Sequence, residues 1–131
     1  MFTQYDPKNS SVLVDGVHIT GLAEDFWSFE KQEALGEDEV GAMGDVCRSV
    51  KNHPLYNVTI TTQKTSPQVP FLRSLASRQI PFPIWNIDKA LGVREGGSQC
   101  LMTEVPADER GATAGELEFK FTAYDGVIEN I

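Results

Sequence analysis

The chain has 131 residues and a mass of 14.5 kDa, of which 40% are hydrophobic and 23% charged, as expected for one folded domain with its own core. Its net charge of −8 argues against a broad basic face that binds nucleic acid. No apolar run approaches the roughly 18 residues of a membrane helix and residues 1–11 lack the apolar core of a signal peptide, so we expect a protein kept inside a cell or inside a particle assembled there.

The first predicted elements, in chain order, are strands joined into hairpins. Asp15-Gly16 separates the apolar runs 11–14 and 17–20 and indicates a tight hairpin, because a type I′ turn needs positive φ at both central residues. The aromatic-rich segment 26–33 is predicted to be a third strand.

A longer hairpin follows. We predict a fourth strand at 45–50, and between it and the third strand lie residues 34–44, which contain three glycines and three consecutive acids. This composition predicts an irregular loop with a mobile tip, ordered only through contact with another subunit.

The middle of the chain contains the one good helix start. Residues 56–62 alternate apolar and polar side chains, as in a half-buried strand. Ser66 can then cap a helix that continues through Gln79, and Pro70 is an alternative start because proline is tolerated in the first turn. The segment 82–87 is predicted to be the next strand.

The last third of the chain is predicted to contain loops and strands. Residues 92–98 are predicted to be a flexible glycine-rich loop, 100–105 a strand and 106–115 a further loop. The clearest strand is 117–124, where Phe119 and Phe121 point to the core and Glu118 and Lys120 point away. With about seven or eight strands in all, we expect a mainly β fold, an antiparallel β-sandwich or barrel with one packed α-helix and a long hairpin.

The residues that usually carry chemistry are sparse. Cys47 and Cys100 lack the CxxC spacing of zinc or redox sites, and His18 and His53 form no metal-binding pair. No nucleophile, phosphate-loop or dinucleotide motif is present. We therefore expect no enzyme, no catalytic residue, no cofactor and no metal site.

Charge is distributed unevenly along the chain. Residues 24–45 have a net charge of −7, residues 46–94 of +6 and residues 95–131 of −6. Two interpretations stay open: solvated strand faces, or head-to-tail contacts in which one surface of a subunit complements a different surface of its neighbour.

The order of these elements resembles that of the tail tube proteins of contractile-tailed bacteriophages and related injection machines, most closely the myophage structural protein family. The segments that carry the resemblance are VLVDGVHITGLAEDFWSFEKQEA, SPQVPFLRSLASRQ before IPFPIWNID, and GELEFKFTAYDGV. It covers nearly the whole chain, so residues 1–131 are expected to form a single tail-tube-like domain.

The resemblance implies a structural subunit that forms homo-hexameric rings stacked into a hollow inner tube. Genome DNA or an effector would pass through the lumen without specific binding, and the other partners would be sheath, baseplate and terminator proteins. The location would be the tail of a virion assembled in the host cytoplasm, with no membrane contact. The predicted stacking hairpin comprises Glu33, Gly36, Glu37, Asp38, Glu39, Gly41, Gly44 and Asp45.

Two alternatives remain open. One is a tail terminator or baseplate subunit of the same fold. The other is a small intracellular β-sandwich binding module in which Trp27, Phe29 and Trp85 line a ligand pocket. Tubes, closed rings that never stack, and a ligand-binding monomer would distinguish the three.

Overall fold

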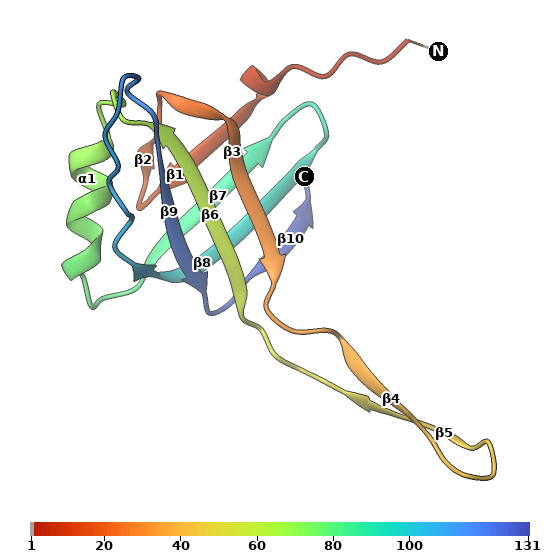
Figure 1. The fold of residues 1–131 in the computed structure, drawn as a ribbon. Helices are drawn as coiled ribbons and strands as arrows, with labels where there is room; N and C mark the ends of the chain where they lie inside the picture. The colour runs from red at the N-terminus through yellow and green to blue at the C-terminus, as the bar shows by residue number, and fades with distance from the viewer. Residues whose placement is uncertain (1) are drawn as a thin grey trace.

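The computed structural model describes residues 2–131 and shows a mainly β chain with antiparallel strands and one short α-helix (Figure 1). The strands are β1 (Ser10–Val14), β2 (Val17–His18), β3 (Leu22–Lys31), β4 (Gly36–Val40), β5 (Val46–Val50), β6 (Tyr56–Gln63), β7 (Phe82–Asp88), β8 (Val93–Glu104), β9 (Glu116–Ala123) and β10 (Val127–Asn130). The helix is α1 (Val69–Ser74), and two 3₁₀ turns are at Pro7–Asn9 and Leu75–Ser77. No helix within residues 2–131 is both long enough and apolar enough to cross a membrane.

Eight strands form one sheet in the order β2-β1-β7-β8-β9-β6-β3, with β10 paired to β8, and β4 and β5 form a separate two-stranded sheet. Every pair is antiparallel. The terminal strands β2 and β3 are not paired with each other, so in the described chain the sheet is open and no barrel closes. The predicted fold class, antiparallel β with one packed helix and a long hairpin, is confirmed.

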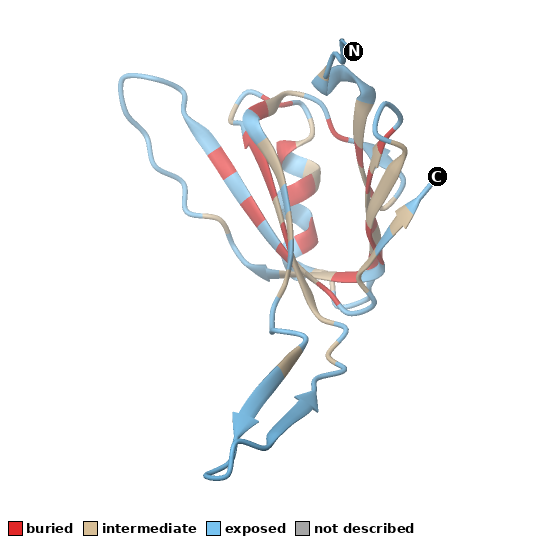
Figure 2. Cartoon of the chain, turned by 90° about the vertical axis from the view of Figure 1, so that its right-hand side faces the viewer, coloured by how far each residue is buried: buried red, intermediate tan, exposed pale blue. Residues whose placement is uncertain are grey.

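The core lies between the inner face of this sheet and α1, which Figure 2 shows against the bent sheet with its buried residues toward the interior. It is formed by apolar side chains from the sheet, α1 and the following turn: Val12, Val14, Ile19, Val58, Ile60, Val69, Leu72, Leu75, Phe82, Ile84, Cys100, Leu117, Phe119, Phe121 and Ala123. The Phe82 and Phe121 rings meet edge to face with centroids 6.0 Å apart, a favoured aromatic geometry.

The first hairpin and the last long strand form where the sequence predicts them. Asp15 and Gly16 have φ of 51° and 79°, as the tight turn between β1 and β2 requires. Along β9 the buried positions alternate with exposed ones, so Phe119 and Phe121 are buried whereas Glu118 and Lys120 are exposed.

The helix is shorter than predicted. It begins at Val69 with Pro70 in its first turn, which is the alternative start, and Ser66 does not cap it. The Ser66 hydroxyl instead donates to the backbone carbonyl of Thr20 at 2.5 Å. That long-range bond replaces the local cap because it ties the segment before α1 to the end of the first hairpin.

The prediction of a flexible loop at 92–98 is wrong, because β8 runs through it from Val93. A Cβ built on Gly96 would lie 2.0 Å from the carbonyl oxygen of Ile84 on the neighbouring strand. The glycine therefore permits a close approach of β7 and β8 rather than flexibility.

Residues 34–44 also differ from the prediction of an irregular loop. Gly36–Val40 forms β4 and pairs with β5 along its whole length. Cross-strand pairing with 46–50 supplies the backbone partners that the local composition alone does not suggest. In addition, β3 begins earlier than the predicted strand, and β10 was not predicted because its four residues alternate too briefly.

The carboxylate of Asp108 connects the loop 106–115 to the body. Asp108 lies 3.1 Å from the Lys64 ammonium and 3.4 and 3.5 Å from the guanidinium groups of Arg73 and Arg110. The hydrogen bond from Lys64 is the largest of several effects that lower the pKa of Asp108 below its ordinary value. Since stability gained by a lowered carboxyl pKa is lost as pH falls, acid should weaken this attachment.

The buried thiol of Cys100 predicts that stability depends on pH in the alkaline range. Burial, helped by the charge of Asp125, raises the pKa of the Cys100 thiol from 9.0 to about 12, whereas Cys47 is exposed. The folded chain keeps the Cys100 proton above pH 9 while the unfolded chain releases it, so the contribution is complete below pH 9 and declines toward pH 12.

Urea unfolding across that range should show a steeper loss of stability in the wild type than in Cys100→Ala, the difference corresponding to at most one proton. Cys47→Ser is the matched control and should keep the wild-type slope. Parallel curves for the wild type and Cys100→Ala would contradict the prediction.

Candidate functional site

The β4–β5 hairpin projects away from the sheet as a narrow arm (Figure 1). At its root the backbone N–H of Lys51 donates to the carbonyl of Leu35 at 2.9 Å. Every residue of the two strands is exposed except Gly36, which is half-buried. The arm is thus held together by its own backbone pairing, with no contribution from the core.

Gly41 and Gly44 lie in the turn at the far end of the hairpin. The N–H of Gly41 donates to the carbonyl of Asp45 at 2.7 Å, and the N–H of Gly44 donates to the carbonyl of Gly41 at 3.0 Å. Gly44 has a φ of +86°, a conformation that disfavours other residues. Three of the predicted stacking residues therefore shape the tip, and Glu33 lies near the root between β3 and β4.

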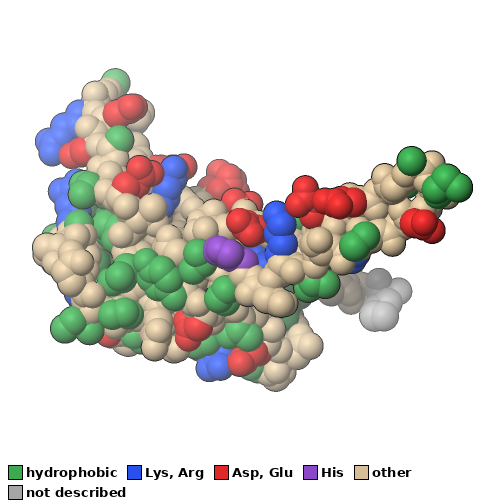
Figure 3. Space-filling view, turned by 90° about the horizontal axis from the view of Figure 1, so that it is seen from below, with side chains coloured by type: hydrophobic (Ala, Val, Ile, Leu, Met, Phe, Trp, Pro, Cys, Tyr) green, Lys and Arg blue, Asp and Glu red, His purple; other side chains and the backbone are tan. Residues whose placement is uncertain are grey.

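The hairpin has two chemically different faces. Directly opposed residues of an antiparallel pair share a face and neighbours along a strand alternate. The pairs Val40–Val46, Asp38–Arg48 and Gly36–Val50 therefore form one face, called here the valine face. The pairs Glu37–Ser49 and Glu39–Cys47 form the opposite, acidic face. Figure 3 shows acidic side chains along the projecting arm and hydrophobic ones toward its far end.

The valine face has several large apolar side chains that are exposed to solvent. The exposed fractions are 71% for Val40, 69% for Val46 and 67% for Val50, and Met43 at the tip is 90% exposed. These residues are absent from the predicted set, which rested on glycine and acid content. The signal that could have identified them is the alternation of Val46, Arg48 and Val50 with Cys47 and Ser49.

The three consecutive acids do not act as one cluster. Glu37 and Glu39 lie on the acidic face, whereas Asp38 lies on the valine face at 3.9 Å from the Arg48 guanidinium. An exposed pair at this distance contributes little to stability. Both side chains therefore remain available to a partner.

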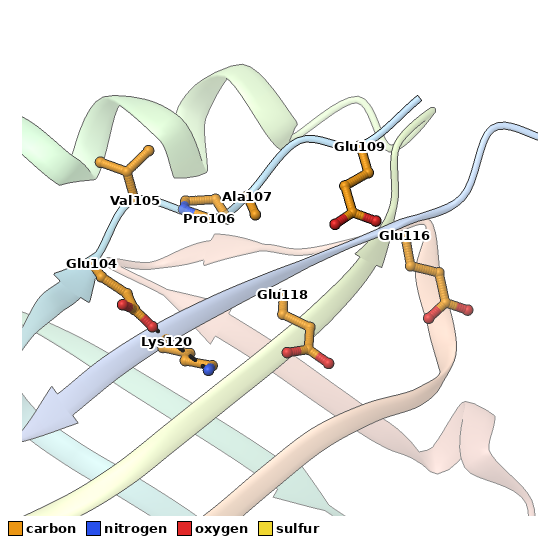
Figure 4. Close-up of a pocket in the computed structure, with 8 residues that line it drawn as sticks. All are labelled: Glu104, Val105, Pro106, Ala107, Glu109, Glu116, Glu118 and Lys120. Atoms are coloured by element: carbon orange, nitrogen blue, oxygen red, sulfur yellow. Dashed lines mark ion pairs between the residues drawn. The ribbon is translucent and has the colours of Figure 1, made fainter. Parts of the chain in front are cut away.

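A second acidic region lies beside β9, where an open hollow is formed with the end of β8 and the loop after it (Figure 4). Its lining residues are Glu104, Val105, Pro106, Ala107, Glu109, Glu116, Glu118 and Lys120. Lys120 pairs with Glu104 at 3.5 Å, and Figure 4 shows the carboxylates spread along the rim rather than converging on one point. This arrangement suits a solvated surface.

The three aromatic residues proposed for a ligand pocket do not line one pocket together. The Trp27 and Phe29 rings stack 6.1 Å apart on the core side of β3, and Phe29 stacks on Tyr56 at 4.6 Å. Trp85 lies on the opposite face of β7 from the buried residues, with the Arg94 guanidinium 4.1 Å from its ring.

Comparison with known proteins gives matches to solved structures. No family model matches the sequence, and no curated protein matches it. A chain of the sheath–tube complex of an extracellular contractile injection system, PVC, superposes with a TM-score of 0.69 at 13% identity, covering 93% of this chain and 88% of that one.

Two further matches extend over nearly the full length. The PVC sheath/tube terminator has a TM-score of 0.68 at 10% identity and 98% coverage of both chains. The tube-terminating cap of the anti-feeding prophage has a TM-score of 0.62 at 11% identity, covering 100% of this chain and 95% of that one. The chain thus has the fold of tail proteins of contractile injection systems, as the resemblance in its sequence predicts.

Proposed function

We propose that this chain is a structural, non-catalytic subunit of the inner tube of a contractile injection machine, and that its copies form rings that stack through the β4–β5 hairpin. The observation that carries the proposal is the hairpin itself, which is folded yet buries none of its valines. An apolar face of this kind marks an interaction site. The fold shared with a sheath–tube complex supports it further.

The resemblance in the sequence extends the proposal to homo-hexameric rings inside a sheath, with baseplate and terminator partners, in the tail of a phage-like particle assembled in the host cytoplasm. DNA or an effector would pass through the lumen. The net charge of −8 supports passage without binding, because an acidic wall repels phosphate.

Electron microscopy of the purified chain tests the proposal directly, since stacked tubes are expected. Thiol labelling supplies a second measurement, because Cys47 lies on the hairpin and is exposed whereas Cys100 is buried. In the assembled state Cys47 should become protected from alkylation. A chain that stays monomeric would contradict the stacking role, and tubes with freely reactive Cys47 would show that the acidic face of the hairpin stays uncovered.

A terminator subunit is the second candidate, supported by the match over 98% of both chains to the PVC sheath/tube terminator. A terminator subunit would form a single ring at the end of the tube and would not extend the tube further. Single rings that remain unstacked at high protein concentration would favour this role over the tube.

Charge reversal on the hairpin should block stacking. The triple variant Glu37→Lys, Asp38→Lys and Glu39→Lys reverses both faces, and we expect no tubes while circular dichroism stays native. Because exposed charges are screened over about 8 Å at physiological salt, we also expect wild-type assembly to weaken as salt rises.

The two-faced hairpin permits a sharper version. Glu37→Lys with Glu39→Lys reverses the acidic face and leaves the Asp38–Arg48 pair unchanged. Glu116→Lys with Glu118→Lys is the matched control, because these acids have the same spacing on the exposed side of β9. Tubes that form as readily as those of the wild type at every salt concentration would show that the hairpin acids only solvate a surface.

A further inference from the structure

An open cavity of about 400 Å³ lies at the end of the sheet where β7 turns into β8. Figure 1 shows this turn on the side of the sheet away from α1. Segments from the N-terminus, β3, β7 and β8 line it: Tyr5, Ser10, Glu24, Asp25, Phe26, Trp27, Asn86, Asp88, Leu91, Val93 and Glu95. We call it the end cavity. It continues the inner face of the sheet beyond the apolar core, because Asn86 and Asp88 follow Ile84 on the buried side of β7.

Two buried polar atoms of the end cavity have no partner within residues 2–131. They are the side-chain oxygen of Asn86 and the indole Nε1 of Trp27. Asn86 is only 7% exposed, so its oxygen has little access to solvent. Buried polar atoms are nearly always hydrogen-bonded. An occupant that donates to Asn86 and accepts from Trp27 would supply both missing partners.

The charge of the cavity selects the kind of donor. Its lining has four carboxylates and no Lys, Arg or His. Asp88 is buried and accepts hydrogen bonds from the Ser10 hydroxyl at 3.2 Å and from the backbone N–H groups of Ala90 and Leu91 at 3.0 and 3.1 Å.

The remaining carboxylates of the end cavity, on Glu24, Asp25 and Glu95, form no ion pair with another described residue. Carboxylates beside aromatic rings favour a guanidinium or ammonium group. A basic side chain on a peptide fits both requirements, because its N–H groups donate to Asn86 and its backbone carbonyl accepts from Trp27.

We propose that the end cavity receives the Arg48 side chain from the hairpin of a second copy of this chain. The inference rests on the self-assembly proposed above and names one contact of that assembly. Arg48 is carried beyond the body on the projecting arm, its side chain is 56% exposed, and its bond to Asp38 is long at 3.9 Å. It shares the valine face with Val46 and Val50, so burial of that face would bring Arg48 to the partner surface.

Charge exchange between the two sites tests the contact in the full-length chain. Arg48→Glu and Glu95→Arg should each raise the protein concentration needed for assembly about tenfold or more, the effect of losing a close charge pair. The double variant should restore assembly, because each contact then contains the same pair with its charges exchanged.

Lys51→Glu is the matched control for this exchange. It reverses an exposed base at the root of the same arm, and Glu95→Arg should not rescue it. A double Arg48→Glu, Glu95→Arg variant no better than the worse single variant would overturn the contact, as would equal rescue of Lys51→Glu.

Asn86→Leu separates recognition from folding. Replacing an unpartnered buried amide by an apolar side chain of similar size should leave the melting temperature unchanged or raise it. Assembly should nevertheless weaken, because the acceptor for Arg48 is gone. A more stable variant that assembles like the wild type would show that water alone fills the cavity, and would overturn the proposal.

A final measurement distinguishes failure of this contact from failure of self-assembly. N-acetyl-arginine-N-methylamide is titrated into unassembled Trp85→Phe protein, where Trp27 is the remaining tryptophan. A saturable change in the Trp27 fluorescence supports the arginine site even if no tubes form, provided that the change is absent when Asn86→Leu is added to the same variant. Absence of the change would overturn the site, and binding of the probe by a chain that never self-associates would overturn the second copy as its source.

Discussion

Replacing Gly36–Val50 by an Asn-Gly turn is expected to abolish tube formation and leave the fold intact. The backbone N–H of Lys51 and the carbonyl of Leu35 already form a hydrogen bond at the root, so a two-residue type I′ turn can close the shortened hairpin. No residue of either removed strand belongs to the core. Circular dichroism and the melting temperature should stay near the wild-type values, while electron microscopy should show no stacked rings.

A variant with the hairpin kept at full length separates its chemistry from its reach. Val40→Thr, Val46→Thr and Val50→Thr keep the β-branched shape that favours strands and make the valine face polar. This variant should also fail to stack. Normal tubes from the shortened chain would show that the hairpin is dispensable. Normal tubes from the threonine variant would show that the apolar side chains of the valine face are dispensable.

Phe119→Ala or Phe121→Ala should each reduce the free energy of unfolding by about 3–5 kcal/mol, the usual cost of removing a buried aromatic side chain and leaving a cavity. Both side chains are at most 1% exposed. Since a domain of this kind has only about 5–15 kcal/mol of stability in total, either variant should be close to unfolding. Urea denaturation followed by circular dichroism measures the change.

The matched control lies on the same strand. Glu118→Ala exchanges an exposed side chain between the two phenylalanines and should alter stability by less than about 0.5 kcal/mol. Phe121→Ala should be at least as costly as Phe119→Ala, because Phe121 also loses its edge-to-face contact with Phe82. Equal destabilisation by Glu118→Ala and the phenylalanine variants would contradict the assignment of the two faces of β9.

The hairpin predictions concern assembly, and the phenylalanine predictions concern the stability of the fold. The phenylalanines hold the body together, and the hairpin is folded without contributing to that body. Variants of the hairpin can therefore lose assembly without losing the fold, whereas core variants lose both. The separation makes assembly measurements interpretable, since the melting temperature reports independently on the sheet.

The candidate site was only partly predictable from the sequence. Glycines and acids placed the hairpin correctly between β3 and β6, because these residue types disfavour a buried core strand. Composition alone does not reveal register, however. It was the pairing of Val40 with Val46 and of Asp38 with Arg48 that divided the arm into a valine face and an acidic face, and separated Asp38 from Glu37 and Glu39.

The sequence by itself determined the features that depend on a few neighbouring residues. Asp15-Gly16 specified the first turn, and the period-two pattern of 117–124 specified a strand with Phe119 and Phe121 inside. Both signals are local, because a turn needs particular φ values and a half-buried strand needs alternation. Together with the order of the elements, they were enough for the fold class.

The tertiary structure alone decided the features that depend on distant segments. Gly96 is typical of a loop in the sequence, but in the fold it lies in β8, where β7 is too close for a side chain. Ser66 has the sequence context of a helix cap, but in the fold its hydroxyl donates a hydrogen bond to the carbonyl of Thr20. Trp27 and Asn86, far apart in the chain, line one end cavity with unpartnered polar atoms. The physical reason is common to all three: a backbone approach, a hydrogen bond or an unpaired buried atom is defined by its partner, which strand order and register bring to it.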